Sequence, residues 1–149
     1  MTVKVRGVAV LALAAMLAAA GALSAQGADK YTVRLGWVPI SGADRANVTG
    51  RGSATATLSG SKLAITGSFE GLAASATVAR LHEGIAKGAR GPAIADLVIT
   101  KGTSGTISGG VALTAEQLAS LKQGRLYIQV HSEKGVAPDG SNLWGWLLR

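Results

Sequence analysis

The two histidines of the chain, His82 and His131, are its candidates for metal chemistry. Both fall late in predicted strands, and an acid lies close to each of them, Glu83 and Glu133 respectively. If the two strands are neighbours in a sheet, the imidazoles could converge, with Asp139 as a further ligand. Two imidazoles and a carboxylate suit zinc or copper. The pattern therefore offers a Cu or Zn site built on His82 and His131.

A structural interpretation of the same histidines competes with the metal site. Arg80 lies on the same strand face as His82, where its fixed charge opposes a divalent cation. The two histidines also form no spacing motif of the kind that metal sites show. We therefore expect both imidazoles to hydrogen-bond backbone groups at the ends of their strands, holding the adjacent glycine-rich loops.

Trp144 and Trp146 are the other residues whose spacing suggests a site. Two residues apart on a predicted final strand, they share one face, with Gly145 and Leu147 on the other. Large aromatic side chains usually anchor the interior, which favours a core position. If that face is instead exposed, the two indoles form an apolar strip that marks a binding surface. The pair is therefore the candidate binding site.

The motifs of common enzyme and nucleotide sites are missing from the sequence. No Gly-x-Ser-x-Gly elbow is present, and the glycine-rich stretch 84–92 lacks the Gly-Lys-Ser/Thr ending of a phosphate-binding loop. The chain has no cysteine, which excludes thiol chemistry and thiolate metal sites. Basic residues are dispersed and aromatic residues are few, unlike a nucleic-acid surface. We assign no catalytic residue and no nucleic-acid partner.

Alternation of apolar and polar residues predicts the strands that would position these candidates. The single exception is a Thr114-x-x-Gln117 capping box, which predicts one short helix over 114–122. Many short strands without βαβ alternation indicate an antiparallel sandwich or barrel. The predicted strands cover 30–38, 53–58, 63–69, 76–82, 94–100, 106–113, 125–132 and 141–148.

The first 25 residues predict export. Lys4 and Arg6 precede a short apolar run that ends in small residues around Ala25, the pattern of a secretory signal peptide. The remaining residues, 26–149, suffice for one domain. Loss of the two basic residues lowers the formal net charge from +7 to +5. We expect a secreted or periplasmic protein that does not span a membrane once the signal is cleaved.

A series of landmark motifs runs along the chain in this order: Trp37-Val38-Pro39, Ala-Thr-Ala-Thr-Leu-Ser-Gly at 54–60, Gly-Ser-Phe-Glu-Gly-Leu at 67–72, Leu-His-Glu-Gly at 81–84, Gly91-Pro92, Leu-Tyr-Ile-Gln-Val-His-Ser-Glu at 126–133 and Pro138-Asp-Gly140. These ordered landmarks resemble the CHRD domain, a module named after chordin that also occurs in secreted bacterial proteins. The resemblance implies an immunoglobulin-like or superoxide-dismutase-like sandwich and says little about activity.

Two departures from the family pattern fall on the candidate sites. The family often has His-x-His where this chain has Arg80-Leu81-His82, and it tends to end in Arg-Gly-Gln where this chain has Trp144-Gly145-Trp146. Taken together, the residues and the resemblance predict an all-β, antiparallel Greek-key β-sandwich of about eight strands with one short helix. The predicted function is a non-catalytic binding or structural module without a cofactor, whose partner is a protein or an envelope polymer. The alternative is a periplasmic Cu or Zn protein.

Overall fold

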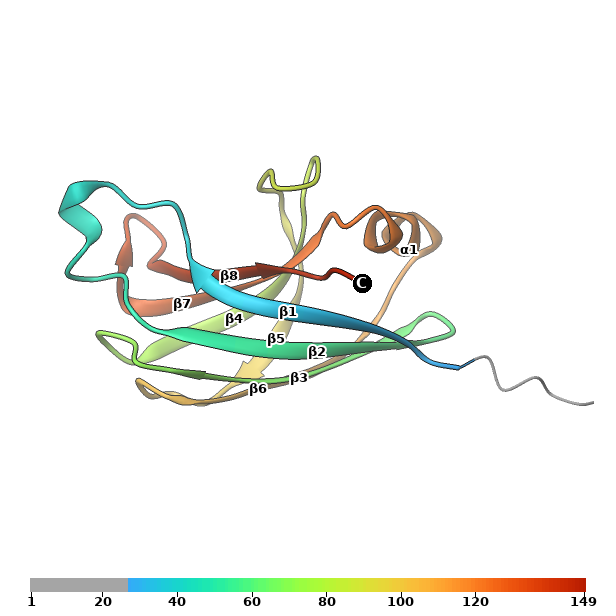
Figure 1. The fold of residues 1–149 in the computed structure, drawn as a ribbon, viewed down its shortest axis with the longest axis horizontal. Coiled ribbons are helices and arrows are strands. Elements are labelled where there is room, and N and C mark those ends of the chain that lie inside the picture. The colour runs from blue at the N-terminus through green and yellow to red at the C-terminus, as the bar shows by residue number, and fades with distance from the viewer. Residues whose placement is uncertain (1–26) are drawn as a thin grey trace, which may run out of the picture.

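The computed structural model describes residues 27–149, and the predicted signal peptide at 1–25 lies outside this range. Eight antiparallel strands and one short helix follow each other as the alternation pattern predicts (Figure 1). None of the helices within the described residues is long and apolar enough to cross a membrane. The elements are β1 (Asp29–Trp37), a 3-10 turn η1 (Gly42–Asp44), β2 (Arg51–Ser59), β3 (Lys62–Glu70), β4 (Ala76–Glu83), β5 (Ala93–Ile99), β6 (Gly105–Ala112), α1 (Ala115–Lys122), β7 (Leu126–Val136) and β8 (Ser141–Trp146).

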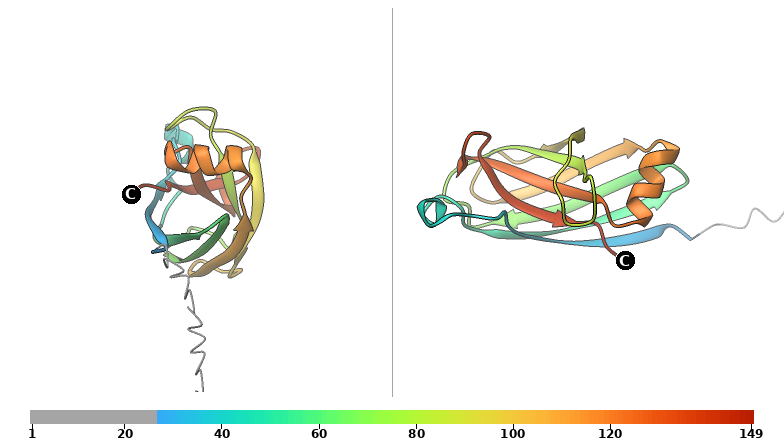
Figure 2. Two further views of the ribbon diagram at one scale, coloured as in Figure 1. Left: turned by 90° about the vertical axis from the view of Figure 1, so that its right-hand side faces the viewer. Right: turned by 90° about the horizontal axis from the view of Figure 1, so that it is seen from above.

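The strands close into a barrel in the order β1-β2-β3-β6-β5-β4-β7-β8. The predicted Greek-key β-sandwich, immunoglobulin-like or superoxide-dismutase-like, is therefore corrected to a closed barrel. Strands β1 and β5 each pair with a strand of one sheet and then with a strand of the other, and this joins the two sheets. β1 pairs with β2 along most of its length and then with β8 through Gly36 and Trp37, while β5 pairs with β4 and then with β6. Figure 2 (left) shows the barrel from one end.

The two closing seams of the barrel are short. Between β1 and β8, the register pairs Gly36 with Trp144 and Trp37 with Leu143, and an isolated bridge joins Thr32 to Leu148. Between β5 and β6 only two residue pairs are formed. Strand alternation has the same period in a barrel and in a sandwich, so local patterns could not distinguish the two architectures.

Strand alternation places the core inside the barrel, as on β1. Tyr31, Val33 and Leu35 are buried, while Lys30, Thr32 and Arg34 between them face outward and are exposed. Trp37 lies on the predicted inward side of the same alternation, yet it is 53% exposed. It stands where β1 leaves the barrel, and its indole nitrogen donates a 2.8 Å hydrogen bond to the carbonyl of Gly50.

Helix α1 lies at the barrel end from which β1 starts (Figure 1). The predicted capping box is confirmed: the Gln117 backbone N–H donates to the Thr114 hydroxyl at 3.2 Å, and the Thr114 N–H donates to the Gln117 amide oxygen at 2.9 Å. Leu121 is buried beneath the helix. The hydroxyl of Ser120 donates to the Glu83 carboxylate, so the helix is tied to the end of β4.

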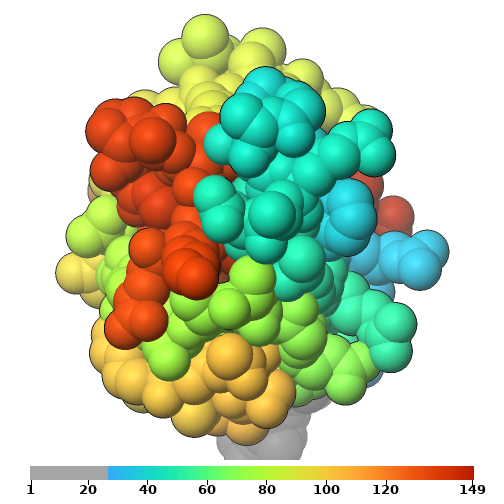
Figure 3. All heavy atoms as spheres, turned by 90° about the vertical axis from the view of Figure 1, so that its left-hand side faces the viewer, coloured from blue at the N-terminus to red at the C-terminus, as the bar shows by residue number. Residues whose placement is uncertain are grey.

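The opposite end of the barrel is covered by two connections. The segment 38–50 between β1 and β2 lies beside the β7–β8 hairpin there, as the space-filling view in Figure 3 shows. The Val38 N–H donates a 3.0 Å hydrogen bond to the carbonyl of Asn142, and this bond joins the two segments. Connecting segments of the chain thus cover both ends of the barrel.

Candidate functional site

Strand β7 is buried on both faces, which is unusual for an antiparallel barrel, whose outer face normally meets water. Its inward residues Leu126, Ile128 and Val130 are in the core, as their alternation predicts. The outward residues Tyr127, Gln129 and His131 are only 1%, 3% and 3% exposed. An outer layer of loops and aromatic side chains therefore covers this strand.

A cluster of four rings forms the centre of this outer layer. The His82 ring stacks on Tyr127 with 4.8 Å between centroids, and Tyr127 packs against Trp146 at 4.5 Å and edge-on against Trp144 at 6.1 Å. The two indoles contact each other at 5.9 Å and 64°. Offset and edge-to-face pairs of this kind stabilise each other beyond the burial of their area. Tyr127 thus supports the two tryptophans from beneath, and His82 in turn stacks on Tyr127.

Trp144 and Trp146 lie on the outer face of β8, partly exposed, so the core interpretation of this pair is wrong. The β7–β8 register explains the outcome. Trp144 pairs with Gln129 and Trp146 with Tyr127, both outward, whereas Gly145 pairs with the inward Ile128. A Cβ on Gly145 would lie 2.6 Å from Val33 Cγ1, and the inside of the seam therefore has no room for an indole.

The exposed faces of the two indoles border a groove that follows the β1–β8 seam. Gly36, opposite Trp144, is exposed, and a Cβ built there would have no neighbour within 4 Å. The same register, continued to the bridge between Thr32 and Leu148, places Arg34 opposite Trp146. The missing side chain at Gly36 leaves a hollow beside Trp144. The groove encloses about 510 Å³ and is lined by Thr32, Arg34, Gly36, Trp144, Gly145, Trp146, Leu148 and Arg149.

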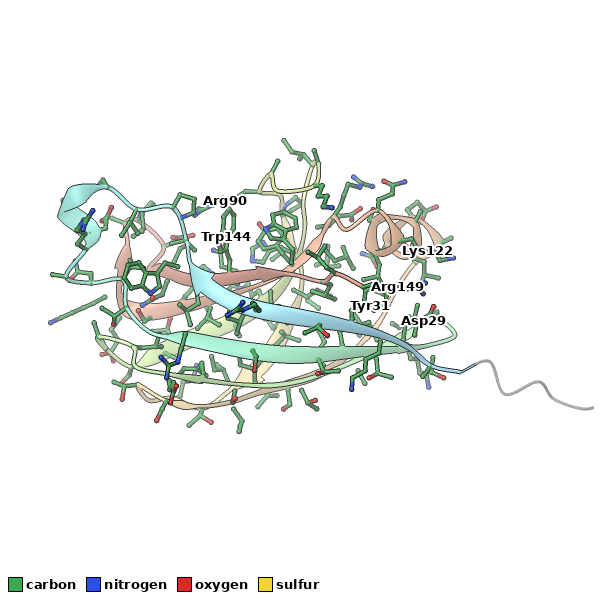
Figure 4. The ribbon with its side chains drawn as sticks, viewed as in Figure 1. Asp29, Tyr31, Arg90, Lys122, Trp144 and Arg149 are labelled. Carbon is green, nitrogen blue, oxygen red and sulfur yellow. The ribbon has the colours of Figure 1, made fainter. Side chains whose placement is uncertain are left out.

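Arginine side chains surround the indole pair. The Arg90 guanidinium, from the loop between β4 and β5, lies 5.4 Å from the Trp144 ring, within cation–π range. Figure 4 shows Arg90 close to Trp144 and Arg149 nearer to α1. Arg149 forms an ion pair with Asp29. In the described part of the chain, Arg34 and Arg90 have no carboxylate partner.

His82 attaches the 84–92 loop to the barrel. Its Nδ1 lies 3.1 Å from the Gly91 carbonyl oxygen and donates to it, and the Tyr127 hydroxyl donates to the same carbonyl at 3.1 Å. His82 Nε2 is buried and has no partner among the described residues. Burial lowers the pKa of His82, and the charges of Arg80 and Arg90 lower it further, against the opposing effect of the Gly91 hydrogen bond. His82 is therefore neutral at pH 7.

His131 holds the β7–β8 hairpin in the same way. Its Nδ1 lies 3.0 Å from the Asp139 carbonyl oxygen, to which it donates, and its Nε2 accepts from the Gln129 amide at 3.2 Å. The expected hydrogen bonds from both imidazoles to loop backbone are confirmed.

The histidines share an outer face but do not meet. His82 pairs with Tyr127 and His131 with Val78, four residues apart along β7, which corresponds to roughly 13 Å along the strand. Within residues 27–149, no three His, Asp or Glu side chains are grouped so that they could hold a metal ion. The structure thus offers no support for the proposed Cu or Zn site at these histidines.

The family follows from a comparison with known domains. A model of the CHRD domain matches residues 38–140, more than half of the chain. The chain belongs to the CHRD domain family. No curated protein and no solved structure matches it significantly.

The matched range divides the outer layer of this CHRD domain. It includes His82, the 84–92 loop, Tyr127 and His131. Every residue that lines the groove lies outside it, in β1 or at and after β8. The match therefore covers β2 to β7 together with His82 and Tyr127, and it includes neither β1, nor β8, nor the groove between them.

Sequence reasoning missed several residues of the site. Tyr127 and Gln129 carry a usable signal, because β7 alternates large apolar residues with large residues that hydrogen-bond, the pattern of a strand buried on both faces. Arg34, Gly36 and Arg90 carry no such signal. Their positions depend on how the first and last strands pair and on how one loop folds back over the barrel.

The lowered pKa of His82 predicts acid sensitivity of the CHRD domain. Above the ordinary value of 6.5, the imidazole is neutral in both the folded and the unfolded chain. As the pH falls below 6.5, the unfolded chain takes up a proton that the folded chain resists, so stability is lost until the folded pKa is passed. Urea unfolding at about pH 7.5 and about pH 5 should show this loss.

A His82→Phe variant is the control for this prediction, because phenylalanine keeps a ring against Tyr127 and cannot titrate. We expect its free energy of unfolding to fall less between the two pH values than that of the wild type. An equal fall in both proteins would show that other groups cause the acid sensitivity.

Proposed function

We propose that this CHRD domain is an exported, non-catalytic binding module of the cell envelope or extracellular space, and that it binds its partner in the groove over β1 and β8. The observation that carries this proposal is the partly exposed pair of Trp144 and Trp146, held on buried rings and bordered by the hollow at Gly36. Rigidly supported aromatic side chains with open faces are typical of residues that dominate binding energy.

The chemistry of the groove supports binding rather than catalysis. Its lining side chains are indoles, arginines, a threonine and a leucine, with no histidine or acid among them. General acid–base catalysis needs such groups within hydrogen-bond reach of the substrate. The two histidines of the barrel donate to loop carbonyls and so have structural partners already.

The compartment and partner class are part of the same proposal. The signal-peptide pattern of residues 1–25 supports a secreted or periplasmic location for the domain at 26–149. The partner is then a protein or an envelope polymer. The alternative function, a periplasmic Cu or Zn protein, lacks a specific observation in its favour because His82 and His131 are held apart.

Retention on isolated envelope material tests this function. The full-length gene is expressed, and the exported protein is purified and sedimented with envelope fractions. A Trp144→Ala, Trp146→Ala double variant should lose about tenfold or more in apparent affinity, because two supported indoles are removed from the groove.

Trp37→Ala is the matched control, since it removes an exposed indole that does not line the groove. It should bind as the wild type does. Equal retention of the double variant and the wild type, with both proteins folded by circular dichroism, would contradict the proposed function.

A further inference from the structure

The side chains of the groove combine flat apolar faces with positive charge. Arg34 and Arg149 line the groove with the two indoles, and Arg90, which is not part of the lining, lies over the Trp144 ring. No carboxylate side chain lines the groove to neutralise them. A ligand that fits must therefore present an apolar ring face and a negative charge close together.

The groove continues across the outer wall of the barrel. Arg34 also lines a second hollow of about 450 Å³ over β2 and β3, whose other lining residues include Ser53 and Ser68. The registers pair Arg34 with Ser53 and Ser53 with Ser68. A path of indole, guanidinium and hydroxyl groups thus crosses four neighbouring strands, and the one carboxylate that lines the second hollow, Glu70, is paired with Arg51. This length suits an extended chain rather than one small molecule.

The chemistry of this path matches an acidic polysaccharide. Sugar rings expose an apolar face of C–H groups that packs against indoles, and their hydroxyls exchange hydrogen bonds with serine and threonine. A uronate carboxylate accepts paired hydrogen bonds from a guanidinium. A protein partner would bury about 800 Å² of this surface, but the wall beyond the indoles is covered by Ser, Thr and Arg rather than by an apolar core.

We propose that the groove binds an acidic, uronate-containing polysaccharide, with sugar rings against Trp144 and Trp146 and a carboxylate paired with Arg34. This inference rests on the proposed function and names its ligand class. The hollow at Gly36 then receives the edge of the ring that packs on Trp144.

Gly36 allows the groove to be filled without disturbing the barrel. Its φ lies outside the left-handed range, and a Cβ there meets no atom within 4 Å. Gly36→Leu should therefore keep the fold and every charge while it occupies the space beside Trp144. Gly110→Leu is the matched control, because Gly110 is also an exposed strand glycine with no atom within 4 Å of an added Cβ, and it lies on β6, away from the groove.

The experiment titrates the exported protein with oligogalacturonate and with its fully methyl-esterified form, followed by tryptophan fluorescence and calorimetry. We expect the acidic form to bind at least about tenfold more tightly than the ester. Gly36→Leu should lose most of this affinity and Gly110→Leu none. Arg34→Gln should reduce binding of the acid about tenfold and leave binding of the ester unchanged.

The outcomes separate this inference from the proposed function. Simple attraction of a basic protein to any polyanion would leave Gly36→Leu unaffected, and that result would overturn the inference. Equal binding of acid and ester, or stronger competition by single-stranded DNA, would also overturn it. If no polysaccharide binds while envelope retention still depends on Trp144 and Trp146, the inference fails and the proposed function stands. If no polysaccharide binds and envelope retention does not depend on Trp144 and Trp146, both the inference and the proposed function are refuted.

Discussion

Replacement of Gly145 by alanine is expected to lower the free energy of unfolding by about 3 kcal/mol or more. The added Cβ would overlap the carbonyl oxygen of Arg34 and lie 2.6 Å from Val33 Cγ1. The neighbours of Gly145 at this seam are backbone and a buried β-branched side chain, neither of which can move away cheaply. The variant must therefore separate β1 from β8, where the barrel is closed by few residue pairs.

Gly36→Ala is the control for this prediction, because it adds the same methyl group to the facing strand of the same seam. Its Cβ has no neighbour within 4 Å, so we expect a change within about 0.5 kcal/mol. Urea unfolding followed by far-UV circular dichroism measures both variants. A loss below about 1 kcal/mol for Gly145→Ala would mean that the β1–β8 seam is not closed, and it would restore the two-sheet sandwich.

Tyr127→Ala is expected to lower the free energy of unfolding by about 3–5 kcal/mol, the range for large aromatic residues in protein cores. Tyr127 lies on the outside of the barrel strands, yet it is 1% exposed and contacts His82, Trp144 and Trp146. Its loss also frees the loop at Gly91, whose backbone N–H and carbonyl both bond the Tyr127 hydroxyl. Near-UV circular dichroism should show the tryptophans losing their fixed environment.

Tyr127→Phe separates the ring from the hydroxyl. Because it removes only the hydrogen bonds to Gly91, we expect it to cost about 1 kcal/mol and to leave the near-UV spectrum of the tryptophans unchanged. If Tyr127→Ala is no more destabilising than Tyr127→Phe, then the outer ring cluster contributes little stability, and the rigid support that we infer for the indoles is wrong.

Local rules were enough to predict the elements of this protein. Strand alternation, as at Tyr31, Val33 and Leu35, reflects a side-chain period that each strand carries in its own residues. The Thr114 and Gln117 capping box likewise involves one helical turn only. The backbone hydrogen bonds of His82 and His131 were also predicted, since histidines beside glycine-rich loops have carbonyls within reach.

The site was predicted only in part, and Trp144 and Trp146 show why. Their spacing on one strand face is a local property and was read correctly. The sequence did not predict which face of β8 points inward, because both faces of this strand carry large apolar residues. The choice was decided by Gly145, whose lack of a side chain lets β1 approach the inner face and leaves the indoles outside.

The sequence by itself determined eight strands, one capped helix, the family and two pairs of candidate residues, because each follows from residues close together in the chain. Only the tertiary structure decided that the sheets join into a barrel, that His82 and His131 stay apart, and that Arg34 stands opposite Trp146. These facts depend on the pairing of strands that are separated in the chain, such as β1 with β8 and β4 with β7. Such pairing is set by packing throughout the barrel and by the contacts that Gly36 and Gly145 permit, and no local pattern records it.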